Sequence, residues 1–191
     1  MEKKMLAAVV YDAGSGVQTD KLLVALADKL QEHGVRVAGT VQSAMDREDR
    51  CACDMIVRDL STNTELKISE DRGPNARGCR LAPHVLETLV GSTIAALEQG
   101  VDVLIINKFG KQEALGAGFR DVISRAVADG VPTMIAVNVT YLDSWRAFAS
   151  DFADELRPDV GQLRQWVAAR LGGRPGDDPD QDSRSASLGT S

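Results

Sequence analysis

A glycine-containing segment, Asp12–Lys21, separates an apolar run from a leucine-rich segment. A strand, a glycine loop and a helix in that order direct backbone N–H groups and a helix N-terminus toward an anion. We therefore predict an anion-binding loop, with candidate ligand residues Gly14, Ser15, Gly16, Thr19 and Lys21. The alternative is an ordinary turn after which Thr19 or Asp20 caps the helix.

The same segment lacks the chemistry of a working phosphate loop. Such a loop reads G-x-x-x-x-G-K-[ST], with the lysine on the phosphates and the hydroxyl on magnesium. Aligned on the following leucine, Ala13 and Gln18 stand at the two glycines, Thr19 at the lysine and Asp20 at the Ser/Thr. An acid thus lies where the phosphates would bind, so we expect triphosphate binding to be weakened or lost.

Polar and charged residues also follow two later apolar runs, 101–106 and 133–138. Ligands of open α/β sheets bind outside the carboxyl ends of the strands. Cationic side chains at that edge would suit a nucleotide, phosphate or another small oxyanion. The candidate ligand residues there are Asn107, Lys108, Lys111, Glu113 and Arg120. Glu113 is either a general base or, more commonly for such a residue, an ion-pair partner of Lys111.

Three arginines, Arg72, Arg77 and Arg80, lie in one loop that also contains glycine and proline. Guanidinium groups bind carboxylates and oxyanions through two parallel hydrogen bonds, so this loop is a second candidate anion site. The same charges would lower the pKa of Cys79. In the alternative, the arginines pair with Glu70 or Asp71 at the surface.

Soft metal ligands are available in the same region. A tetrahedral zinc or copper(I) site could form from Cys51, Cys53, Cys79 and His84. The spacing does not require a metal, and reduced, partly buried thiols are the alternative. The two histidines of the chain lie far from any G-x-S-x-G motif, so triad hydrolysis is not expected.

Strand-like and helix-like segments alternate along the chain, and these are the elements that must position the candidate residues. This βαβ order predicts an α/β fold with a parallel sheet covered by helices on both faces. The apolar periods predict strands over 6–11, 35–42, 101–107 and 133–138. They predict helices over 20–33, 85–99 and 119–128. Two short runs, Met55–Leu60 and Glu65–Ser69, flank a turn-forming segment and predict an inserted antiparallel hairpin. Later aromatic residues, Trp145, Phe148, Phe152 and Trp166, predict helices that pack on the sheet.

Length and charge bound the whole molecule. The 191 residues suit one domain over 1–171, and the Gly-, Pro-, Asp- and Ser-rich segment 172–191 is expected to be a disordered tail. A net charge of −6 disfavours nucleic acid and anionic membranes as partners. Apolar runs are too short to span a bilayer, no secretory signal is evident, and the cytoplasm is the expected location. A homo-oligomer is possible.

Several motifs in this chain resemble one bacterial family. They are Cys53–Met55, Arg58–Leu60, Gly78–Leu81, Asn107–Glu113, Phe119–Arg120 and Tyr141–Phe148. In these the chain resembles the family catalogued as domain of unknown function 2478. That family is itself similar to the thermophilic nucleoside-triphosphatases. The second likeness rests on element order and on Gly110, Lys111 and Glu113. It implies a P-loop NTPase-like fold.

The resemblance also shows a departure. The nucleoside-triphosphatases carry an acidic pair at the end of the strand before Gly110, which holds magnesium and polarises water. This chain has Asn107 and Lys108 there. We therefore predict a small-anion-binding protein, with a nucleotide, phosphate or molybdate as ligand, in an accessory or sensing role without conventional NTP hydrolysis. One alternative is a divergent magnesium-dependent nucleoside-triphosphatase or kinase, using Lys21 or Lys108 in place of the usual lysine and Asp12 or Asp20 for magnesium. The other is an oligomeric structural partner. The sequence identifies no cofactor.

Overall fold

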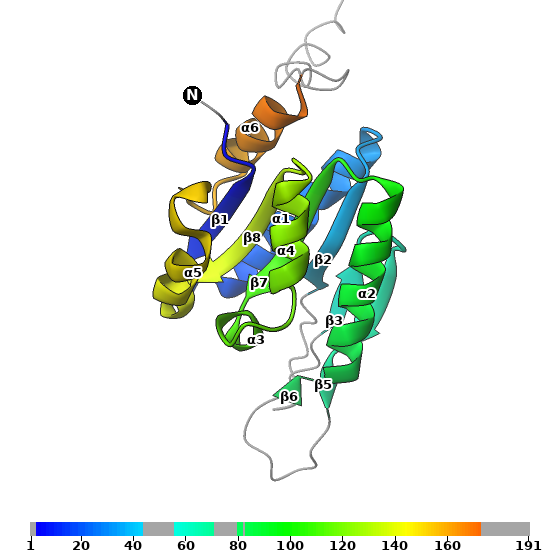
Figure 1. Cartoon of the computed structure of the whole chain (residues 1–191), viewed down its shortest axis with the longest axis vertical. Helices are drawn as coiled ribbons and strands as arrows, with labels where there is room; N and C mark the ends of the chain where they lie inside the picture. The colour runs from blue at the N-terminus through cyan, green and yellow to red at the C-terminus, as the bar shows by residue number, and fades with distance from the viewer. Residues whose placement is uncertain (1–2, 44–55, 71–79, 82, 173–191) are drawn as a thin grey trace, which may run out of the picture.

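A computed structural model describes residues 3–43, 56–70, 80–81 and 83–172, and a seven-stranded sheet lies at its centre (Figure 1). The strand order is β4-β3-β2-β7-β8-β1-β9. The parallel strands are β1 (Leu6–Tyr11), β2 (Val37–Ser43), β7 (Val103–Phe109), β8 (Thr133–Asn138) and β9 (Ala153–Leu156). Strands β1, β7 and β8 are mostly apolar because both of their faces are buried, which confirms the predicted parallel sheet, whereas β2 also contains Gly39, Thr40 and Gln42. The edge strand β9 carries Asp154 and Glu155, and its polar sequence was not predicted as a strand.

The predicted hairpin is confirmed. Strands β3 (Ile56–Asp59) and β4 (Thr64–Lys67) pair antiparallel with each other, and β3 pairs antiparallel with β2. The hairpin therefore extends the main sheet instead of forming a separate layer. A small two-stranded sheet of β5 (Ser69–Glu70) and β6 (Arg80–Leu81) lies outside it.

Helices cover both faces of the sheet, as predicted (Figure 1). One face packs against α1 (Gly16–Glu32) and α6 (Val160–Leu171). The other packs against α2 (Pro83–Gln99), α4 (Arg120–Ala128) and α5 (Leu142–Ala149). Three one-turn helices complete the chain: α3 (Lys111–Ala114), η1 (Val139–Tyr141) and η2 (Ser150–Phe152). None of the helices in these ranges is long and apolar enough to cross a membrane.

Of the four predicted aromatic anchors, two are buried, Phe148 is partly buried against the core, and one is exposed. Trp145 of α5 and Trp166 of α6 lie in the two cores. Phe152 is 73% exposed, so the prediction that it packs on the sheet is wrong. The reason is that α5 ends at Ala149, and the following η2 turns Phe152 outward.

A glycine allows β2 and β7 to approach closely. Gly39 has a φ of +100°, and a Cβ built on it would lie 2.0 Å from the carbonyl oxygen of Ile105. Since a side chain cannot fit there, only glycine permits this pairing. The pairing of Gly39 with Ile105 and of Thr40 with Ile106 brings the carboxyl ends of β2 and β7 side by side.

Candidate functional site

The loop between β1 and α1 contains only residues 12–15. The Oδ1 atom of Asp12 accepts hydrogen bonds from the Gly14 N–H at 3.1 Å and from the Ser15 hydroxyl at 2.6 Å. The Ser15 hydrogen bond is the main reason that the pKa of Asp12 is lowered, and bonds from the Gly14 and Ser15 N–H groups add to it. Part of the loop's donor capacity is therefore already used by the chain's own carboxylate.

The predicted alignment with a phosphate loop is wrong in its register. Helix α1 begins at Gly16, so Gln18, Thr19 and Asp20 lie inside the helix and not in a loop before it. Thr19 is buried and donates its hydroxyl to the Ser15 carbonyl oxygen at 2.8 Å, as a residue one turn into a helix does. Neither Thr19 nor Asp20 caps the helix. The missing lysine does not depend on the register, because residues 5–20 contain none.

A polar cluster lies at the carboxyl ends of β2 and β7 beneath the first turns of α1, and we name it the Lys108 cluster. The Nζ atom of Lys108 lies 3.1 Å from Gln42 Oε1 and 3.4 Å from Asp20 Oδ2. Asn107 donates from Nδ2 to the same Gln42 oxygen at 3.1 Å. Four side chains from α1, β2 and β7 thus meet around one ammonium group.

The members of the cluster differ in their access to solvent. Asp20 is 3% exposed and Asn107 is 6% exposed, whereas the side chain of Lys108 is 34% exposed. Asp20 Oδ1 and Asn107 Oδ1 are buried and make no hydrogen bond with the described residues. Burial raises the pKa of Asp20, and the positive charge of Lys108 offsets part of that rise. Lys108 is therefore the charged member of the cluster whose side chain a ligand can reach.

Tyr11 lies at the end of β1 next to this cluster. Burial, and then the charge of Asp20, raise the pKa of Tyr11. A hydrogen bond with the side chain of Asn138, at the end of β8, opposes this rise. The carboxyl ends of all four central strands thus contribute polar side chains to one edge.

Glu113 is a structural residue and not an accessible base. It is 5% exposed, its Oε2 accepts the Gly110 N–H at 3.0 Å, and its Oε1 accepts the Phe119 N–H at 3.1 Å. Both oxygens hold the loop after β7, so the expected pairing with Lys111 is wrong. Gly118 has a φ of +62°, and a Cβ there would lie 2.1 Å from Glu113 Oε1, so the loop closes tightly around the carboxylate.

The other predicted cations are placed differently from Lys108. Lys21 and Lys111 are exposed on α1 and α3. Arg120 donates from Nη1 to the Glu113 carbonyl oxygen at 3.2 Å, and its guanidinium lies 4.6 Å from the centre of the Phe148 ring. Arg120 thus has structural partners. Lys108 is the predicted cation that the fold fixes among buried polar groups at the strand ends.

The described residues do not include enough of the second predicted anion site, or of the predicted metal site, to show either one assembled. Arg72, Arg77, Cys51, Cys53 and Cys79 lie outside the described ranges, and Arg80 is placed only as backbone in β6. His84 is exposed in the first turn of α2. Within residues 3–43, 56–70 and 83–172, no group of three His, Cys, Asp or Glu side chains could hold a metal. Both sites remain predictions.

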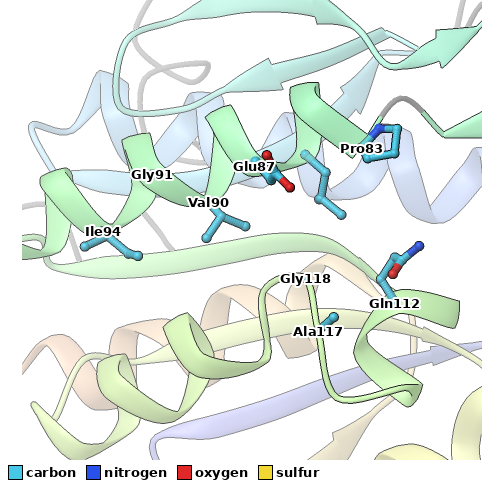
Figure 2. A pocket seen from close by; sticks show the side chains of 9 residues that line it. Pro83, Glu87, Val90, Gly91, Ile94, Gln112, Ala117 and Gly118 are labelled. Atoms are coloured by element: carbon cyan, nitrogen blue, oxygen red, sulfur yellow. The ribbon is translucent and has the colours of Figure 1, made fainter.

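A pocket of about 340 Å³ lies between α2 and the loop that follows α3 (Figure 2). Figure 2 shows Val90 and Ile94 of α2 opposite Ala117 and Gly118, with Gln112 at one end. None of the predicted ligand residues lines it. This mostly apolar pocket is therefore separate from the Lys108 cluster.

Sequence reasoning missed the two acceptors that hold Lys108. Gln42 is the penultimate residue of β2, and the signal that could have found it is its position at the carboxyl end of a strand that neighbours β7. The sequence suggested Asp20 as a helix cap or a magnesium ligand, and not as a partner of Lys108. Its burial on the sheet side of α1, beside Leu23, indicates a member of the site.

Comparisons with known proteins agree with this architecture. The solution structure of a human cancer-related nucleoside triphosphatase superposes with a TM-score of 0.57, covering 88% of this chain and 99% of that chain at 16% sequence identity. This likeness shows the P-loop NTPase-like fold.

Sequence relatives give the family. A molybdenum import ATP-binding protein, ModC 2 of Bradyrhizobium diazoefficiens, is 31% identical over 166 residues, which are 87% of this chain and 18% of that protein. The match therefore covers a small part of that relative. Residues 6–166 match the family described as protein of unknown function (DUF2478), and the chain belongs to that family.

Proposed function

We propose that this chain binds a small anion at the carboxyl edge of its sheet through Lys108, without a divalent cation and without conventional NTP hydrolysis. The observation that carries the proposal is the position of Lys108, whose ammonium is held between Gln42 and Asp20 and whose side chain is partly exposed to solvent. The role that suits such a protein is that of an accessory or sensing factor.

The ammonium supplies a cation where nucleoside-triphosphatases use magnesium. The resemblance to those enzymes implies an acidic pair at the end of β7, where this chain has Asn107 and Lys108. A fixed ammonium beside a buried carboxylate provides positive charge without any ion from solution. Anion binding at this edge therefore needs no magnesium.

Helix α1 supports the same site. Its N-terminus follows β1 at this edge, and the Ser15 side chain makes no capping hydrogen bond. The N–H groups of the first turn carry the positive end of the helix dipole, which favours a bound anion. The ammonium and the helix end thus act on the same region of the sheet edge.

The ligand class follows from the loop and from the relative. Because Asp12 already occupies the Gly14 N–H, a polyphosphate chain would have to displace a carboxylate and bind beside its charge. A single tetrahedral oxyanion is therefore favoured over a triphosphate. Since the relative is a molybdenum import ATP-binding protein, molybdate and nucleotides are the first ligands to compare.

Thermal unfolding in the presence of anions tests the proposal. The purified protein is heated with ATP, GTP, phosphate, sulfate or molybdate, each with magnesium and again with EDTA. A ligand at a hundred times its Kd adds about 2.7 kcal/mol to the free energy of unfolding. We expect one or more anions to stabilise the protein equally in EDTA and in magnesium.

Variants assign that stabilisation to the site. Lys108→Met should abolish the shift, whereas Lys29→Met, which alters an exposed lysine in the last turn of the same α1, should retain it. Stabilisation that survives in Lys108→Met contradicts the site assignment. Stabilisation by ATP alone that requires magnesium favours the divergent nucleoside-triphosphatase instead.

A further inference from the structure

We propose that the anion site takes up a proton together with the anion, and that Asp20 is the residue that binds this proton. This inference rests on the proposed function, because it concerns the same Lys108 cluster. It adds a second ligand, the proton, to the small anion.

The geometry of Asp20 provides the reason. Its Oδ2 has a single hydrogen-bond partner among the described residues, the Lys108 ammonium at 3.4 Å, and its Oδ1 has none. The side chain is almost fully buried, at 4% exposure. The negative charge of this buried carboxylate is balanced by one ammonium group, so it becomes unbalanced if that ammonium moves away.

Among the described residues, few ionisable groups act on Asp20. Lys108 reaches it from β7, and Tyr11 of β1 interacts with it electrostatically. The neighbours Gln42 and Asn107, from β2 and β7, carry no charge. Lys108 is thus the group that compensates the Asp20 charge.

An anion at the sheet edge competes for that compensation. Lys108 is the more exposed member of the pair, so a bound oxyanion attracts its ammonium outward and away from Asp20. The bound oxyanion and the buried Asp20 carboxylate would then share the single positive charge of Lys108. Protonation of Asp20 removes the second negative charge, and the resulting carboxyl O–H group can donate a hydrogen bond to a neighbouring acceptor.

Calorimetry with sulfate as the probe tests this coupling, because sulfate stays fully ionised over the range used. Binding is measured in EDTA in buffers of different ionisation enthalpy, from about pH 5 to about pH 8. We expect up to about one proton taken up per sulfate, and an affinity that falls up to about tenfold per pH unit as pH rises. Asp20→Asn should bind sulfate with no proton uptake and no pH dependence.

The control and the outcomes separate the two proposals. Glu32→Gln removes an exposed carboxylate from the same helix and should leave proton uptake unchanged. Sulfate binding without proton uptake in the native protein overturns this inference and leaves the proposed function standing. Proton uptake that persists in Asp20→Asn also overturns it. Absence of binding by sulfate, phosphate and molybdate alike overturns the proposed function and this inference with it.

Discussion

The desolvation cost of the Lys108 cluster falls mainly on Asp20. A buried carboxylate loses its hydration and regains only part of that loss from one ammonium at 3.4 Å. Lys108 keeps a third of its side chain in solvent and loses less. The pair is therefore poorly suited to stabilising the fold, which favours a role in binding.

Asp20→Asn should make the protein more stable at neutral and alkaline pH. Since the folded-state pKa of Asp20 is raised, the folded state holds more protons than the unfolded state between the two pKa values. The native protein therefore loses stability as pH rises through the folded-state pKa, and the variant does not. Tm measured against pH should show the two curves converging below the carboxyl's ordinary pKa. A native curve that rises with pH relative to the variant would contradict the account.

The sequence contained part of this site. Asn107 and Lys108 could be placed at the sheet edge because they follow a buried strand. Gln42 and Asp20 could not be joined to them, because their contacts depend on which strands are neighbours and on which face of α1 is buried. Strand order places β2 beside β7, although 59 residues lie between the end of β2 and the start of β7 in the chain.

The loop between β7 and α4 depends on one buried carboxylate. Glu113 accepts the Gly110 and Phe119 N–H groups, so it closes both ends of the loop. This loop immediately follows Lys108 and fixes the path of the chain out of the site. Sequence reasoning assigned Glu113 to the ligand set because it follows the carboxyl end of a strand, but its burial is a tertiary property.

Glu113→Gln should destabilise the protein, although the two side chains have nearly the same shape. The amide has one acceptor instead of two, so its NH₂ group faces a backbone N–H and leaves that group unpaired. The expected cost is about 1 to 3 kcal/mol in chemical denaturation. The exposed Glu87→Gln in α2 serves as the control and should change stability little. Equal stability of the two variants would argue against the structural role of Glu113.

A second prediction at the scale of the secondary-structure elements concerns the close approach of β2 to β7. Gly39→Ala should destabilise the protein by about 3 kcal/mol, because the new methyl group meets the Ile105 carbonyl and the backbone has a positive φ. Gly91→Ala in α2 meets no atom within 4 Å and should stabilise by about 0.5 to 1 kcal/mol. Urea unfolding of both variants checks the contrast. A Gly39 variant as stable as the native protein would mean that the strands do not approach as described.

At the scale of the whole molecule, hydrophobic patterning predicted the fold well. Strands β1, β7 and β8 are mostly apolar runs, and the helices between the strands carry apolar stripes, so their order predicted an α/β architecture. Helix ends were less predictable: α1 begins at Gly16, four residues before the predicted start, because glycine and serine looked like loop residues. Strand β9 was missed because two of its four residues are acidic.

The fold resembles that of a nucleoside triphosphatase, yet the site has an ammonium at the end of β7 and no lysine in residues 5–20. We expect no magnesium-dependent hydrolysis of ATP or GTP above the level of a buffer control, measured as released phosphate. Turnover that requires magnesium and disappears in Lys108→Ala would instead support the divergent enzyme.

The central claim is that Lys108 binds a small anion without a divalent cation. Its most direct test is calorimetric titration of molybdate, sulfate and phosphate into the native protein and into Lys108→Met, both in EDTA, with Lys29→Met as the control. The account predicts saturable binding of at least one anion to the native protein and to Lys29→Met, and none to Lys108→Met. Equal binding by all three proteins, or binding that appears only when magnesium is restored, would contradict it.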